Sequence, residues 1–142
     1  MSRLFLIVLA LGLGLSACAP QATIPVLPPS ERPYAPQPGD SVLLRTEVYL
    51  DSTEVRNLNS EPATFALDLR GNSPSPCHQL RVVVSAPNGQ NQIMVDVYSV
   101  ANPDEMCIVM LQPFDTSVIL GKFSGGHYTV WLNGEQIGEF NT

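Results

Sequence analysis

Residues 78–100 read HQLRVVVSAPNGQNQIMVDVYSV, and this stretch decides the fold. Asn88-Gly89 is the preferred residue pair for a two-residue hairpin turn, and the residues on either side alternate between apolar and polar. A turn at this pair places Arg81 opposite Asp96 on the polar side. On the other side it brings together three apolar pairs, Val84 with Ile93, Val82 with Val95, and Leu80 with Val97. The stretch therefore predicts an antiparallel hairpin with one core-facing side.

A second hairpin is predicted at the end of the chain, in HYTVWLNGEQIGEF at 127–140. Asn133-Gly134 supplies the turn. In this register Val130 faces Ile137 toward the core, while Trp131 faces Gln136 on the opposite side.

Short alternating segments between turn residues predict further strands at 48–50, 53–58, 64–69, 107–111 and 117–121. About seven short strands in a hundred residues are typical of an all-β fold with two packed sheets. We therefore expect one immunoglobulin-like antiparallel β-sandwich, with a small closed β-barrel as the alternative architecture.

The beginning of the chain has the composition of a secretion signal. Met1 to Arg3 form a short positive start, and Leu4 to Leu15 form an apolar run of 12 residues. A helix needs about 20 apolar residues to span a bilayer, so this run is too short for a transmembrane helix. The pattern predicts a signal peptide over 1–17.

The run ends in Leu15-Ser16-Ala17-Cys18, which resembles the lipobox of bacterial lipoproteins. In that family the peptide is cut before the cysteine, which then carries a diacylglycerol and usually a third acyl chain. The resemblance implies lipidation of Cys18 and an exported protein, anchored to the cell membrane or, since Ala19 follows, to an outer membrane. Two or three chains also suit stable anchoring, because one myristoyl-length chain holds a protein only reversibly.

Residues 18–40 are predicted to be the lipidated cysteine and a tether, because seven of the 21 residues from Ala19 to Gly39 are proline. The β-sandwich domain is then expected over 41–142. Without residues 1–17 the protein has 6 basic and 13 acidic residues, a formal charge of −7. This charge argues against nucleic acid as a partner and against attraction to anionic lipid headgroups.

Lipidation of Cys18 leaves two cysteines, Cys77 and Cys107, in an exported chain. We expect a disulfide between them, worth about 3 to 4 kcal/mol by the loop-entropy model. A zinc site from Cys77, His78, Cys107 and His127 is the alternative. It is disfavoured because zinc ligands usually come in pairs two to four residues apart. No cofactor beyond the lipid is expected.

The segments LRGNSPSPCHQLRVVVSAPNGQNQIMVDVYSVANPDEMCIVMLQPF and LGKFSGGHYTVWLNGEQIGEF resemble a group of uncharacterised bacterial lipoproteins with an immunoglobulin-like domain. The resemblance covers about 66–140 and includes the Pro-Cys-His step, a second cysteine about 30 residues later, and the last hairpin. It supports the sandwich fold and implies no catalytic residues.

No motif nominates an enzyme: Ser124 has neither the glycine spacing of a nucleophile elbow nor that of a phosphate-binding loop. The predicted function is therefore a non-enzymatic binding or structural module, with a small protease inhibitor or a metal-binding domain as alternatives. A partner-binding surface is expected on the outer face of the last hairpin, since tryptophan is common among binding hot spots. Its predicted residues are Trp131, His127, Thr129 and Phe140, the last facing His127.

Overall fold

The structure is a computed structural model that describes residues 33–142 of the 142-residue chain. The predicted signal peptide at 1–17, the lipidation site Cys18 and the tether up to residue 32 lie outside the described residues. Between residues 33 and 142, no helix has the length and apolar character needed to cross a bilayer.

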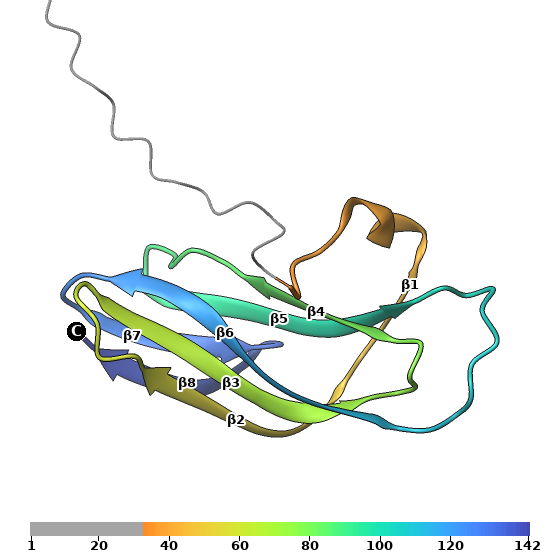
Figure 1. The fold of residues 1–142 in the computed structure, drawn as a ribbon. Helices are drawn as coiled ribbons and strands as arrows, with labels where there is room; N and C mark the ends of the chain where they lie inside the picture. The colour runs from red at the N-terminus through yellow and green to blue at the C-terminus, as the bar shows by residue number, and fades with distance from the viewer. Residues whose placement is uncertain (1–32) are drawn as a thin grey trace, which may run out of the picture.

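Two β-sheets pack face to face and confirm the predicted β-sandwich (Figure 1). One sheet contains β1, β4, β5, β7 and β8, and the other has the order β2-β3-β6. A 3-10 turn, η2 (Pro38–Val42), precedes the strands. Their bounds are β1 (Leu44–Thr46), β2 (Tyr49–Asn57), β3 (Ala63–Ser73), β4 (Gln79–Val84), β5 (Gln92–Ala101), β6 (Gln112–Phe123), β7 (His127–Leu132) and β8 (Glu135–Asn141).

Strand pairing is antiparallel as predicted, except between β5 and β7, which run parallel. β5 pairs with β4 along one edge. Its other edge is shared, because β7 pairs with residues 92–95 and β1 with residues 99–101. A parallel neighbour needs a long connection, and here the chain visits the second sheet through β6 before it returns as β7.

The core lies between the two sheets and contains the apolar side chains that alternate along the strands. At one end it is aromatic: Phe65 of β3 stacks on Phe140 of β8 with ring centroids 3.7 Å apart, and Phe123 of β6 packs edge-on against both. Elsewhere the buried aliphatic residues are Leu67, Leu69, Leu80, Val82, Ile93, Val95, Val97, Leu120, Val130 and Leu132.

The first hairpin is present, but its predicted register is wrong by two residues. Val82 pairs with Val97 and Val84 with Val95, because the tight turn lies one residue later than predicted, at Gly89-Gln90. Asn91 takes the positive φ of 56°, and its N–H donates to the Asn88 carbonyl oxygen at 3.0 Å. A shift of two leaves every side chain on its predicted face, which is why the apolar side is still buried.

The shift removes the predicted charge pair between Arg81 and Asp96. Arg81 lies opposite Tyr98 in the pairing of β4 with β5. Its guanidinium instead binds the carboxylate of Asp40, while Asp96 binds Arg45 of β1 at 2.8 Å.

The second hairpin has the predicted Asn133-Gly134 turn, with positive φ at both residues, and pairs Trp131 with Gln136 as expected. A bulge between Val130 and Trp131 then moves the register by one, so that Val130 pairs with Gly138 instead of Ile137. Gly138 permits a close approach, since a Cβ there would lie 3.1 Å from Cγ2 of Val55 in β2.

Two of the other strand predictions need correction. The segments 48–50 and 53–58 form one strand, β2, with an irregularity between Leu50 and Ser52. The segment 107–111 is not a strand, because it lies in the connection from β5 in one sheet to β6 in the other and has no neighbouring strand.

The domain also begins earlier than residue 41. Tyr34 packs against the core and its carbonyl oxygen accepts a 2.7 Å hydrogen bond from the Val82 N–H, while Ala35 is buried. Asp40 forms the ion pair with Arg81. Residues 34–40 therefore belong to the sandwich, although their prolines suggested a tether.

Candidate functional site

The predicted disulfide is present and joins Cys77 to Cys107, with the two Cα atoms 6.1 Å apart. Cys77 lies in the β3–β4 connection and Cys107 in the β5–β6 connection. Both connections lie at the same end of the sandwich (Figure 1). The disulfide thus attaches the ten-residue connection at 102–111 to the rest of the domain.

Ser75 and His78 lie directly beside this disulfide. A tight turn brings them together, since the His78 N–H donates to the Ser75 carbonyl oxygen at 3.1 Å. The Ser75 hydroxyl is buried and lies 2.7 Å from His78 Nδ1 and 3.3 Å from Cys107 Sγ. The sequence singled out His78 as a candidate zinc ligand and as part of the Pro-Cys-His step, and nothing in the sequence pointed to Ser75.

The β5–β6 connection beyond the disulfide is apolar and exposed. Met106 is 99% exposed and Val109 100%, and Ile108, Met110 and Leu111 are each more than half exposed. We call residues 106–111 the apolar loop. Side chains at odd-numbered and at even-numbered positions face solvent, so neither side of the loop packs on the domain. Exposed apolar side chains gathered in one segment are typical of an interaction site.

A strand was predicted at 107–111 because this segment is apolar and partly β-branched. Such a run in isolation does not distinguish a buried strand from an exposed loop. Only the sheet topology shows that no strand lies beside it.

The structure places three of the four residues predicted for a partner-binding surface, Trp131, Thr129 and His127, at alternate positions of β7. Trp131 and Thr129 are half-buried on the outer face, where Trp131 Nε1 donates to Thr129 Oγ1 at 3.1 Å. His127 is exposed, with its ring near Asn141 and Glu139. In the parallel ladder Trp131 lies beside Met94, which is 40% exposed.

Phe140 is not part of this surface, which corrects the prediction. The bulge places it opposite Tyr128 instead of His127, so its ring turns inward. There it is buried against Phe65 and Phe123. The sequence could not show the bulge, because a two-residue Asn-Gly turn fixes the register only next to the turn.

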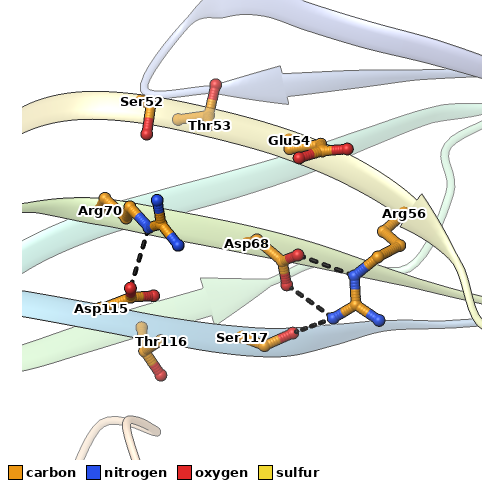
Figure 2. A pocket seen from close by; sticks show the side chains of 9 residues that line it. All are labelled: Ser52, Thr53, Glu54, Arg56, Asp68, Arg70, Asp115, Thr116 and Ser117. Carbon is orange, nitrogen blue, oxygen red and sulfur yellow. Dashed lines mark hydrogen bonds and ion pairs between the residues drawn. The ribbon is translucent and has the colours of Figure 1, made fainter.

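The outer face of the β2-β3-β6 sheet carries a shallow polar hollow (Figure 2). Arg56 binds Asp68 through two hydrogen bonds, at 2.8 and 3.0 Å, and Arg70 binds Asp115 at 2.9 Å. The hydrogen bonds from Arg56, and next the one from Ser117, lower the pKa of Asp68 to about 2. These ionic groups are paired with one another across neighbouring strands, an arrangement that stabilises a sheet surface modestly.

The zinc alternative does not fit the geometry. Cys77 and Cys107 are joined to each other, so neither supplies a thiolate. Across residues 33–142, no three His, Cys, Asp or Glu side chains are grouped in a way that could hold a metal ion.

The C-terminal part of the chain matches a known protein family. The model of a protein family described as the ORF11 beta-sandwich domain matches residues 67–142, a range that begins within β3 and includes both cysteines of the disulfide. None of the curated proteins and none of the solved structures matches the chain.

Proposed function

Because the chain belongs to the ORF11 β-sandwich domain family, whose description names an architecture and no reaction, we propose that it is a non-enzymatic binding module. It works at the cell envelope, where lipid on Cys18 anchors it to the membrane. The LSAC motif after the apolar run supports the anchor. The exposed apolar loop at 106–111 carries the binding role.

A protein is a better occupant for the loop than the bilayer interior. Residues 106–111 form no backbone–backbone hydrogen bond with the rest of the described chain. In hydrocarbon each unpaired N–H and C=O group would cost free energy, so irregular backbone does not enter the lipid core. A protein surface with a free strand edge can pair these groups and accept the side chains in pockets.

The acidic residues next to the loop indicate which charge to expect on the partner's surface. Asp104 and Glu105 are exposed and directly precede Met106. Complementary potentials favour association, so the partner surface should combine apolar pockets with a basic rim.

The loop is tested by placing a photo-crosslinking amino acid at Val109 in the full chain and irradiating cells that carry it in their own envelope. We expect a discrete protein adduct. The matched control is the same probe at Gln90, which is exposed in the turn at the other end of β5. Absence of an adduct at Val109, equal adducts at both positions, or crosslinking to lipid would each contradict the proposal.

The protease-inhibitor alternative is tested by measuring whether the protein inhibits a panel of serine proteases. Inhibition by the wild type that is lost in Val109→Asp would assign the loop to this alternative.

The anchor is tested separately, by growing cells with an alkyne-tagged fatty acid. The wild-type chain should be labelled and found in the membrane fraction, because two or more acyl chains hold a protein stably at a bilayer. Cys18→Ser should lose the label and leave that fraction. Retained label in Cys18→Ser would show that the lipid lies elsewhere.

A further inference from the structure

Ser75 occupies a position that the binding role does not explain. Its side chain is buried between a histidine ring and the sulfur of a disulfide. The Ser75 hydroxyl has one proton and lies 2.7 Å from His78 Nδ1 and 3.3 Å from Cys107 Sγ. When His78 carries its proton on Nδ1, the imidazole donates to the Ser75 oxygen, and the Ser75 hydroxyl donates to Cys107 Sγ. In this tautomer two hydrogen bonds run in one direction, from His78 through Ser75 to Cys107.

This direction matters for thiol–disulfide exchange. When a thiolate attacks one sulfur of a disulfide, the other sulfur leaves as a thiolate, and exchange is faster when the leaving sulfur is the better-stabilised anion. A donor aimed at Cys107 Sγ stabilises negative charge on that sulfur, and hydrogen bonds to charged groups are the stronger ones. The second bond, from His78 Nδ1–H, polarises the donor further.

We propose that the Cys77–Cys107 disulfide is a thiol-exchange site, attacked at Cys77, with Cys107 as the leaving group and Ser75 and His78 as positioning residues. The substrate class is a dithiol of the kind that thiol–disulfide oxidoreductases carry.

The reaction has two steps. In the first, the incoming thiolate forms a bond to Cys77 Sγ, the Cys77–Cys107 bond breaks, and its electron pair goes to Cys107 Sγ, which later takes a proton from water. In the second, the other thiol of the dithiol attacks the mixed disulfide and releases Cys77 as a thiolate. The dithiol is oxidised to its disulfide, and the protein gains two thiols.

Exchange at this site would change how the apolar loop is held. Cys107 is the second residue of that loop, and the disulfide is its covalent link to the β3–β4 connection. After reduction the ten-residue connection is attached only at its two ends, to β5 and β6. The chemistry itself does not depend on the proposed binding function and can be tested without a partner.

The test measures reduction of the full chain in detergent by dithiothreitol, followed by alkylation and mass spectrometry. We expect Ser75→Ala to be reduced about fivefold more slowly than wild type, and His78→Phe about twofold more slowly. With glutathione, a monothiol, the mixed disulfide should be found on Cys77.

If Ser75 only stabilised the fold, the disulfide of Ser75→Ala would be reduced faster than that of wild type. Loss of a structural hydrogen bond loosens the domain, exposes the disulfide and speeds its reduction. Ser73→Ala is the matched control, because Ser73 is also buried but makes no hydrogen bond to either sulfur; its rate should be unchanged or faster. Reduction of Ser75→Ala at or above the wild-type rate would overturn the proposal. Glutathione bound mainly to Cys107 in the wild type would overturn it independently of any variant.

Discussion

Arg81→Met is expected to lower the free energy of unfolding by about 3 kcal/mol, because it leaves the Asp40 carboxylate buried without its counter-ion. The side chains of Arg81 and Asp40 are only 7% and 12% exposed. Arg81 Nε and Nη2 donate to the two carboxylate oxygens of Asp40 at 2.7 and 2.9 Å. Urea unfolding at neutral pH measures the loss.

Two further variants separate the buried pair from a general effect of charge. Arg81→Met combined with Asp40→Leu should regain most of the stability, because replacing both partners removes the uncompensated charge. Arg45→Met, which breaks the exposed pair with Asp96, should cost less than about 1 kcal/mol. A similar loss from Arg45→Met and Arg81→Met would refute the assigned role of burial.

The same pair makes a pH-dependent contribution. The Arg81 side chain, by hydrogen bonding, lowers the pKa of Asp40 below its ordinary value. A lowered pKa in the folded state gives stability that is present above the unfolded pKa, about 3.9, and is lost as the pH falls through the folded value. Wild type should therefore lose more stability than Arg81→Met between pH 5 and the acid limit. The contribution of Asp68 is common to both proteins and cancels in the comparison.

Asn133→Ala is expected to cost about 3 kcal/mol, because this side chain closes a gap in the sheet. β7 ends at Leu132 and β1 pairs only from residue 99 of β5 onward, which leaves Val97 without a strand on that side. Asn133 Oδ1 accepts from the Val97 N–H at 2.8 Å, and Nδ2 donates to the Val97 carbonyl oxygen at 3.0 Å. An alanine leaves both groups unpaired and must also adopt the positive φ of 49°.

Asn133→Asp tests the two hydrogen bonds separately. Aspartate tolerates positive φ and can still accept from the Val97 N–H, but it cannot donate to the carbonyl oxygen. Its loss should be about half that of Asn133→Ala, measured by thermal unfolding. The matched control is Asn88→Ala, in the other hairpin turn, where the side chain binds exposed backbone N–H groups and about 1 kcal/mol is expected. Equal losses at both turns would show that Asn133 acts only as a turn residue.

Asn133 has one role that the sequence predicts and a second role that it does not. The Asn-Gly pair is a local signal, and the type of turn follows from the positive φ that these residues accept. Its second role depends on Val97, 36 residues away in sequence, and on two strands that share one edge of β5. No local pattern contains that information.

Side-chain alternation predicted the faces of the first hairpin, but it did not predict every face of the second. Alternation assigns each side chain to a face, and the first hairpin kept its faces through a shift of two residues. In the second, a bulge moved Phe140 by one position and so to the opposite face. Bulges and loop lengths depend on how the sheets pack, which alternation does not record.

The sequence by itself determined the β class, the Asn133-Gly134 turn, the core-facing residues of the first hairpin and the pairing of Cys77 with Cys107. These follow from local conformational preference, from side-chain alternation and from counting cysteines. Only the tertiary structure decided that residues 34–40 belong to the domain, that Arg81 pairs with Asp40, that the apolar loop stands exposed, and that Ser75 faces the disulfide. Each of these depends on segments far apart in sequence, whose proximity results from packing two sheets around one core.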